Sequence, residues 1–361
     1  VPFCATRCGY CDFNTYTAAE LGPGASPAGY ADTVIQEVRL ARRVLGDAAP
    51  RVETVFFGGG TPTLLPAADL VRILRAIAGE FGLAPGAEVT TEANPESVSP
   101  AYLEELRAGG FTRVSFGMQS AREHVLRVLD RRHTPGRAVQ AVREAHAAGF
   151  AHVNLDLIYN TPGESDDDWR ATLETALAAG PDHVSAYSLI VEDGTRLAAR
   201  VRRGELPMPD EDVAADRYLI AEELLSAAGF RWYEISNWAR TEAGRCRHNL
   251  LYWTSGDWWG AGPGAHSHVG GTRWWNVKHP ARYAARLAAG KSPAQAREVL
   301  TPEERATERI MLELRLATGL PLDAIPPGAR PACARPLADG LLEVEPFKAG
   351  RAVLTLQGRL L

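Results

Sequence analysis

Three cysteines lie in one short segment near the start of this chain. Cys4, Cys8 and Cys11 form a C-x3-C-x2-C pattern, and no fourth cysteine lies close to them in sequence. Three thiolates on a four-iron cluster leave one iron open to an outside ligand, whereas a cluster that only carries electrons is normally held by four cysteines. The spacing therefore predicts an iron–sulfur cluster at which chemistry can take place.

A zinc site and a disulfide framework are the two alternatives for these cysteines. A zinc site would need a fourth nitrogen or sulfur ligand, which only Cys246, His248 or Cys333 could supply, each as a single residue. A disulfide framework fits less well, because the total of 5 cysteines is odd and three of them share one loop. Nothing in the sequence marks the chain as secreted.

A run of three glycines follows a β-prone apolar stretch. Residues 56–63 read FFGGGTPT. Glycines let a backbone approach a ligand where a Cβ atom would clash, although a flexible turn would show the same run. The segment is not a phosphate loop, because no Gly-Lys-Ser/Thr follows, and it lacks the spaced glycines of a dinucleotide-binding fingerprint.

The elements that must position these residues alternate between strands and helices, as in parallel βα units. Strands are predicted at 54–57, 88–92, 113–117, 153–158, 183–189 and 230–235, and helices at 30–45, 67–81, 100–109, 122–129, 135–149, 167–180 and 209–229. With a first strand that leads into Phe3, this pattern predicts an α/β fold of about six units, a partial (β/α)6 TIM-type barrel. Such a barrel has a gap that suits a large substrate.

Polar residues end or interrupt three of the predicted strands. Glu92 ends the second strand, Gln119 follows the third, and Asp156 lies inside an apolar strand. Barrel chemistry takes place at the carboxyl ends of strands, and a buried carboxylate is unfavourable unless it is paired or contacts a ligand. Each residue alone could be satisfied by loop amides or an arginine. Their recurrence on three strands favours a site.

The pattern changes after residue 290. A helix is predicted from Pro302, and residues 339–344 with 352–356 indicate a β-hairpin. We therefore expect two domains, a partial barrel at 1–290 and a small winged-helix-like domain at 291–361, and the end of the second domain could be truncated.

Composition favours a cytoplasmic protein. The chain has 361 residues and a net charge of -5, so neither nucleic acid nor an anionic membrane is a default partner. No apolar run is long enough to span a bilayer, and no signal peptide is visible.

The cysteine loop and the glycine run, in this order, resemble the radical S-adenosylmethionine (SAM) superfamily. In that superfamily three cysteines hold a [4Fe-4S] cluster, the amino and carboxylate groups of SAM bind the open iron, and a glycine-rich edge contacts the methionyl part. One electron from the cluster cleaves SAM to a 5′-deoxyadenosyl radical. The resemblance implies that this chain binds the same two cofactors.

Within the superfamily, nearly the whole chain resembles the oxygen-independent coproporphyrinogen III oxidases and their relatives. By this resemblance the SAM-binding residues are Tyr10, Gly59, Gly60, Thr61, Glu92, Gln119, Arg131 and Asp156. A guanidinium such as that of Arg131 suits a carboxylate, but Arg132 beside it leaves the register open.

Two features resemble the haem chaperones of the HemW type more than the oxidases. Oxidases carry a further cysteine two residues after the third, where this chain has Phe13. Residues 248–253 read HNLLYW and match the HNxxYW motif of those chaperones, in which the histidine is implicated in haem binding. His248 is therefore the predicted haem ligand, and Cys246 is the alternative.

The surrounding region also suits haem. Residues 231–275 contain seven of the 8 tryptophans, and aromatic faces give a flat apolar ligand a large contact area. The alternative is that His248 caps a turn over a packed aromatic core. His266 and His268 are predicted to have structural roles.

The resulting hypothesis is a haem chaperone that passes haem to apo-haemoproteins, and the alternative is an oxidase that decarboxylates porphyrinogen propionates through the deoxyadenosyl radical. An electron donor is an expected partner. The sequence leaves open whether SAM cleavage is required, and therefore whether the protein is an enzyme. It also leaves open a homodimer and peripheral membrane association.

Overall fold

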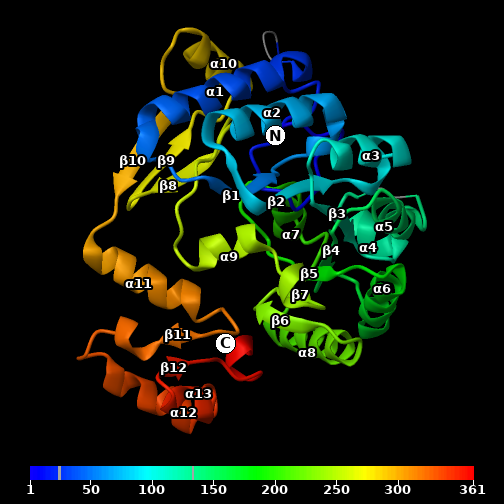
Figure 1. Cartoon of the computed structure of the whole chain (residues 1–361). Coiled ribbons are helices and arrows are strands. Elements are labelled where there is room, and N and C mark those ends of the chain that lie inside the picture. Colours follow the sequence, from blue (N-terminus) through cyan, green and yellow to red (C-terminus); the bar gives the residue numbers. More distant parts are fainter. Residues whose placement is uncertain (23–25, 132–133) are drawn as a thin grey trace.

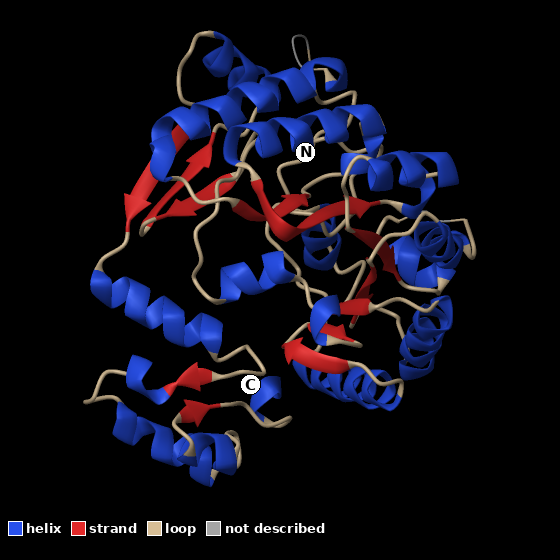
Figure 2. Ribbon diagram, in the orientation of Figure 1, coloured by secondary structure: helices blue, strands red, loops and turns tan. Residues whose placement is uncertain are grey.

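The computed structural model describes residues 1–22, 26–131 and 134–361. Its centre is a curled, half-barrel sheet with the strand order β1-β2-β3-β4-β5-β7-β6 (Figures 1 and 2). The strands are β1 Val52–Phe57, β2 Leu83–Ala93, β3 Arg113–Gln119, β4 His152–Tyr159, β5 His183–Ser188, β6 Arg231–Glu234 and β7 Asn237–Ala239. β1 to β5 run parallel, which confirms the predicted α/β partial barrel.

Helices cover the outer face of this sheet. They are α1 Tyr30–Leu45, α2 Ala67–Phe81, α3 Pro100–Ala108, α4 Glu123–Val128, α5 Arg137–Ala147, α6 Asp166–Ala179 and α8 Glu211–Ala227, whereas α7 Arg196–Arg202 lies against the cysteine loop. α1 and α2 have the predicted bounds, because their apolar residues recur at helical spacing and pack into the main core. α9 (Arg247–Trp253) lies on the opposite, concave side of the sheet from α1 and α2 (Figure 1).

The prediction of a sixth parallel strand at 230–235 is wrong. β6 occupies this segment, but it pairs antiparallel with β7, and β7 pairs antiparallel with β5. Only residues 235 and 236 separate β6 from β7, and a connection this short can join only antiparallel strands. At the other end, Gly60 donates its N–H to Val1 O and Thr61 donates to Phe3 O, so residues 1–3 run beside the segment after β1.

A second sheet packs beside α1. It has the order β10-β9-β8, with β8 His266–Val269, β9 Thr272–Asn276 and β10 Ala294–Val299, and α10 Pro280–Ala288 lies between β9 and β10. The buried carboxylate of Glu37 on α1 accepts hydrogen bonds from Asn276 Nδ2 at 2.8 Å and from Gly262 N–H at 2.8 Å. β9 and β10 lie on either side of residue 290 in the sequence and pair with each other. The domain boundary predicted at residue 290 stays a prediction.

The carboxyl-terminal residues form a small unit with its own apolar core. Its elements are α11 Pro302–Glu313, β11 Leu320–Pro321, α12 Ala334–Ala338, α13 Val344–Lys348 and β12 Arg351–Ala352. Leu320, Ile325, Leu342 and Ala352 form the core. The two segments of the predicted hairpin do pair, at an antiparallel bridge between Leu342 and Leu354, but α13 and β12 lie between the paired residues.

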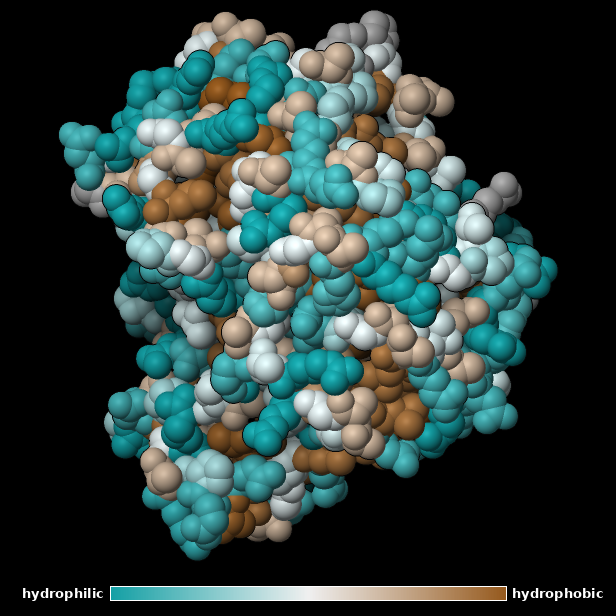
Figure 3. Space-filling view, turned by 45° about the vertical axis from the view of Figure 1, so that its right-hand side comes forward, coloured by the Kyte–Doolittle hydropathy of each residue, from teal (hydrophilic) through white to brown (hydrophobic). Residues whose placement is uncertain are grey.

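The face in Figure 3 is mainly hydrophilic, with apolar side chains in separate patches. Among the described residues, no helix combines the length and the apolar character needed to cross a membrane.

Candidate functional site

The carboxyl ends of β1 to β4 bring the predicted SAM-binding residues to one edge of the sheet. Glycines 58–60 directly follow β1, Glu92 is the penultimate residue of β2, and Gln119 ends β3. Asp156 on β4 pairs in register with Gly117 on β3. Parallel strands end at the same side of a sheet, so the fold collects these side chains as predicted.

The cysteine loop is fixed to the same edge by backbone hydrogen bonds. Gly9 N–H donates to Leu129 O at 3.0 Å, and Leu197 N–H donates to Gly9 O at 2.8 Å. A Cβ atom on Gly9 would lie 2.6 Å from Asp130 Oδ2. Glycine therefore lets the loop approach the segment after α4 without displacing the Asp130 side chain.

Arg131 lies against the cysteine loop. Its Nη1 is 3.4 Å from Cys8 Sγ, and its Nη2 donates to Gly117 O at 2.6 Å. Its Nε is buried and has no hydrogen-bond partner within the described residues, so one donor is left for a ligand such as a carboxylate. Arg132, the alternative in register, lies outside the described residues.

The thiols fit a four-iron cluster. All three cysteines are half-buried, and burial raises the pKa of Cys4 and of Cys11. Iron must displace these protons when it binds. Among the described residues, no group of three or more His, Cys, Asp or Glu side chains is arranged to hold one metal ion. A four-iron cluster does not need that arrangement, because each thiolate binds a different iron. The assignment of the three cysteines to a cluster stays a prediction.

Glu92 and Asp156 form an acidic pair at the edge. Gly59 N–H donates to Glu92 Oε2 at 3.0 Å, and Asp156 accepts from Ser115 Oγ at 2.6 Å and from Asn154 Nδ2 at 2.8 Å. Burial raises the pKa of Glu92 to about 7, and the negative Asp156 adds to this effect. A bound cation would favour the charged form of both carboxyls. The ammonium and sulfonium groups of SAM are such cations.

Gln119 has a backbone conformation that sequence patterns do not reveal. Its φ is 65°, in the left-handed region that residues other than glycine rarely adopt. A Cβ atom on Gly117 would lie 2.8 Å from Arg131 Nη2 and 2.9 Å from Gln119 Nε2. Gly117 therefore leaves room for both side chains at the end of β3. Backbone strain of this kind is concentrated at functional sites.

Tyr10 is placed differently from the other predicted SAM-binding residues. Its ring packs against a small apolar cluster that includes Val125, Leu129 and Ile158. Burial raises the pKa of its phenol, and Arg131 partly opposes this increase.

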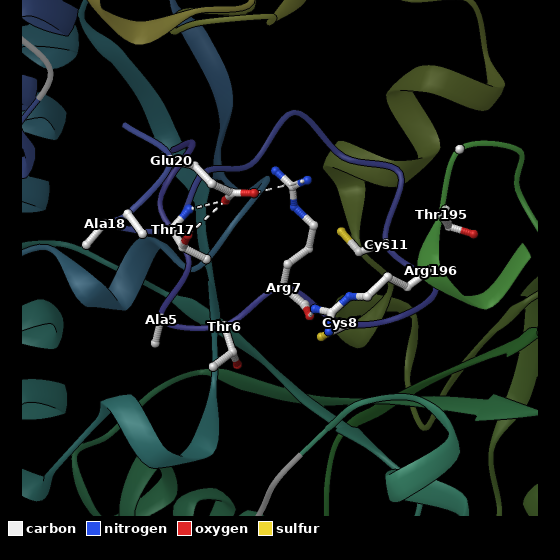
Figure 4. Close-up of a pocket in the computed structure, with 12 residues that line it drawn as sticks. Ala5, Thr6, Arg7, Cys8, Cys11, Thr17, Ala18, Glu20, Thr195 and Arg196 are labelled. Atoms are coloured by element: carbon white, nitrogen blue, oxygen red, sulfur yellow. Dashed lines mark hydrogen bonds and ion pairs between the residues drawn. The ribbon is translucent and has the colours of Figure 1, made fainter. Parts of the chain in front are cut away.

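On the outer side of the cysteine loop lies a hollow of about 680 Å³, which Cys8 and Cys11 help to line (Figure 4). An ion pair between Arg7 Nη1 and Glu20 Oε1, at 3.6 Å, crosses it.

His248 lies on the concave face of the sheet, near the middle of β1. Its Nδ1 is 2.8 Å from Thr54 Oγ1, its Nε2 is 2.9 Å from Tyr252 Oη, and its ring stacks on Phe56 at 5.1 Å. Burial lowers the pKa of His248 to about 4, so the ring is neutral at pH 7. Both ring nitrogens of the predicted haem ligand are therefore hydrogen-bonded in this conformation.

Cys246, the alternative ligand, is buried. Its Sγ is 3.6 Å from Glu88 Oε1, and burial raises its pKa to about 12. The Glu88 carboxylate also accepts the N–H groups of Arg247 at 3.1 Å and His248 at 3.0 Å. The first turn of α9 is therefore fixed to β2 by one carboxylate, which the sequence analysis did not identify.

The sequence analysis also did not identify a chain of buried, hydrogen-bonded polar side chains. His183 Nδ1 is 2.6 Å from Asn154 Oδ1, and His183 Nε2 is 2.7 Å from Tyr233 Oη. Asn154 also bonds Asp156, so the chain reaches the acidic pair. Alternate residues of a strand share one face, and on β5 His183, Ser185 and Tyr187 are polar at this spacing. This pattern could have identified the concave face as polar.

Comparison with known proteins was made for the sequence and for the fold. Residues 1–176 match the family model of the radical SAM superfamily. The chain is 55% identical over 361 residues to the haem chaperone HemW of Mycobacterium tuberculosis, and this match covers 100% of this chain and 91% of that protein. It is 32% identical over 324 residues to HemW of Bacillus subtilis, and this match covers 89% of this chain and 83% of that protein. The structure of the coproporphyrinogen III oxidase HemN of Escherichia coli superposes with a TM-score of 0.82 at 23% identity. The superposition covers 100% of this chain and 86% of HemN.

Proposed function

Because the chain belongs to the HemW family of haem chaperones, within the radical SAM superfamily, we propose that it binds haem and transfers it to haem-free haemoproteins. The observation that carries this proposal is the 55% identity to a HemW protein over all 361 residues. The 23% identity to HemN is evidence for a shared fold alone. Phe13, at the position of the oxidases' further cysteine, is 58% exposed and supplies no thiol.

The cofactors of the proposal are a [4Fe-4S] cluster and SAM. Cys4, Cys8 and Cys11 would hold the cluster. SAM would be surrounded by Tyr10, which lies within the cysteine loop, and by Gly59, Gly60, Thr61, Glu92, Gln119, Arg131 and Asp156. When bound, the cluster supplies an electron for the cleavage of SAM. Glu92 and Asp156 would offset the positive charge of SAM, and the free Nε of Arg131 would donate to its carboxylate.

The aromatic region around α9 is the proposed haem site. Tyr252 is 37% exposed and stacks edge-to-face with His248 at 5.0 Å and with Trp258 at 4.7 Å. An apolar, aromatic surface of this kind suits the porphyrin face. A cytoplasmic location and an electron donor stay predictions, and the sequence leaves open a homodimer, peripheral membrane association and the need for SAM cleavage.

Haem transfer and decarboxylation are tested on the same anaerobic sample. The cluster is reconstituted, haem is titrated in, and the haem-loaded protein is mixed with a haem-free haemoprotein while its absorption spectrum is followed. Coproporphyrinogen III is offered in parallel with SAM and a reductant. We expect one haem per chain, transfer to the acceptor and no decarboxylation. Decarboxylation without haem uptake would establish the oxidase alternative.

A further inference from the structure

The two ring nitrogens of His248 have different surroundings. Nδ1 contacts the sheet, where it lies 2.8 Å from Thr54 Oγ1 near the middle of β1. Nε2 lies 2.9 Å from the hydroxyl of Tyr252, and this contact is at the surface, because Tyr252 is 37% exposed. Of the two nitrogens, Nε2 is therefore the one that becomes accessible to an outside ligand when the tyrosine hydroxyl moves away.

Residues of β1 and β2 hold the rest of His248 in place. Its ring stacks on Phe56 at 5.1 Å, with an angle of 15° between the two planes. Thr54 and Phe56 alternate on β1, so their side chains lie on the same face of the sheet. The backbone N–H of His248 donates to Glu88 Oε1 at 3.0 Å, and Glu88 is the β2 partner of Thr54. These contacts fix the plane of the ring and direct Nδ1 at Thr54 before any ligand binds.

Tyr252 covers Nε2 without being buried itself. It is the penultimate residue of α9, and its ring meets those of His248 and Trp258 edge-to-face, at 5.0 Å and 4.7 Å. Its hydroxyl has no other hydrogen bond to the described residues. A rotation of this one side chain would therefore uncover Nε2 with the loss of a single hydrogen bond, and it would leave Thr54 and Phe56 in place.

The two hydroxyls differ in how well they donate to a neutral imidazole, in which one nitrogen carries a proton and the other accepts. A phenol is more acidic than an aliphatic hydroxyl, so it is the better donor and the poorer acceptor of the two. The contacts are therefore best satisfied when His248 Nδ1–H donates to Thr54 Oγ1 and Tyr252 Oη donates to Nε2. In this tautomer the lone pair that can bind iron is on Nε2, and a metal-bound histidine commonly donates its other N–H in this way.

We propose that Thr54 positions His248 for the haem iron by accepting its Nδ1–H, and that Tyr252 is a displaceable cap on Nε2, the ligating nitrogen. This inference rests on the proposed function, since it concerns how the histidine of that haem site presents its nitrogen. A hydrogen bond from Nδ1–H makes the imidazole a stronger ligand. A cap that returns to Nε2 suits a protein that must release haem as well as bind it, because the nitrogen regains a partner when the iron leaves.

The first test is made before haem is added, on the protein with its cluster reconstituted. With isotopically labelled histidine, NMR correlations between ring nitrogens and ring protons report which nitrogen carries the proton, and His248→Gln identifies the signals of His248. We expect the proton on Nδ1. A proton on Nε2 would overturn the inference and would leave the proposed function untouched.

The second test compares haem binding in wild type, Thr54→Val, Thr54→Ser and Tyr252→Phe. Haem is titrated into each, and the iron–histidine stretching band of the ferrous haem is recorded by resonance Raman spectroscopy with Soret excitation. Thr54→Val removes the acceptor, so we expect the band at lower frequency and haem binding weaker by about tenfold or more. Thr54→Ser is the matched control, because it keeps the hydroxyl, and it should keep both values. Tyr252→Phe keeps the ring and removes the cap, so haem binding should become about threefold to tenfold tighter with the band unchanged.

The outcomes separate this inference from the function on which it rests. Thr54→Val with the band and the haem affinity of the wild type would overturn the inference and leave the chaperone function intact, and so would an affinity loss of about tenfold in Tyr252→Phe. Absence of stoichiometric haem binding in the wild type would overturn both. The guanidinium unfolding midpoint of each haem-free variant reports folding, and Thr54→Ala replaces Thr54→Val if that midpoint falls. The alanine variant should show the same lowered band.

Discussion

Replacing Tyr233 by phenylalanine should destabilise the protein far more than the loss of a single oxygen suggests. Tyr233 is 1% exposed, and its hydroxyl donates to His183 Nε2 at 2.7 Å while it accepts the backbone N–H of Cys246 at 3.3 Å. Asn154 Oδ1 can only accept, so His183 carries its proton on Nδ1 and its Nε2 needs a donor. Burial lowers the pKa of His183 well below its usual value, which agrees with a neutral ring.

The magnitude follows from the two groups that lose their partner. A buried polar group left unsatisfied lowers the free energy of unfolding by about 1–3 kcal/mol. Phenylalanine would leave two such groups, the His183 ring nitrogen and the Cys246 N–H, and both residues are buried. Since the bond to Cys246 is long, we expect a total loss of about 2–4 kcal/mol. The effect should be concentrated at α9, because Cys246 directly precedes that helix.

Two measurements check this prediction. The shift of the guanidinium unfolding midpoint gives the change in free energy, and amide hydrogen exchange of residues 246–253 reports the local opening of α9. Tyr159→Phe is the matched control, because Tyr159 is also buried and its hydroxyl has no hydrogen bond to the described residues. If Tyr233→Phe and Tyr159→Phe differed by less than about 0.5 kcal/mol, the polar chain would not have the energetic role argued here.

Three further predictions concern titration and the cysteines. The pKa of His248 is about 6.5 in the unfolded chain and about 4 in the folded protein. The free energy of unfolding should therefore fall as the pH falls from about 6.5 to about 4, and it should fall less in His248→Gln. Thermal unfolding at several pH values would show this difference. SAM affinity measured by calorimetry should rise with pH through about 7 as Glu92 ionises, and Glu92→Gln should abolish that dependence. Iron and sulfide analysis should find the cluster lost in Cys8→Ser and retained in Cys246→Ser, because Cys246 is 7% exposed and bonded to Glu88.

Much of the scaffold could be predicted from the sequence because its signals are local. The helices at 30–45 and 67–81 have apolar residues at helical spacing, and glycines 46 and 82 end them with positive φ. The acidic start of α6 is equally local, since Ser165 and Asp168 form a capping box. Local patterns also predicted the polar ends of the strands. They could not predict that the chain turns back after β6, because that depends on a connection two residues long.

The details of both sites depend on contacts between distant residues, and for this reason the sequence could not specify them. Glu88 and His248 are 160 positions apart, and no local pattern links a glutamate on β2 to the amides of α9. The HNLLYW motif predicted a histidine at the site, but the motif itself does not show that Thr54 and Tyr252 occupy both ring nitrogens. The left-handed φ of Gln119 likewise lies at a register shift in the pairing of β3 with β4, between Gly117 and Gln119, which the sequence does not reveal.

The position of α9 follows from the polarity of the concave face. Thr54 pairs in register with Glu88 on β2, and alternate residues of that strand place Glu88 and Glu92 on one face. Apolar packing alone could not cover this face, because each buried carboxylate needs donors. The amides that begin α9 supply them to Glu88, and Gly59 N–H supplies one to Glu92. Asn154 bonds both Asp156 and His183, so the groups that hold the acidic pair and those that hold α9 share partners. A change at Asp156 must therefore alter the bonding of Asn154, and through His183 and Tyr233 it reaches the helix that carries His248.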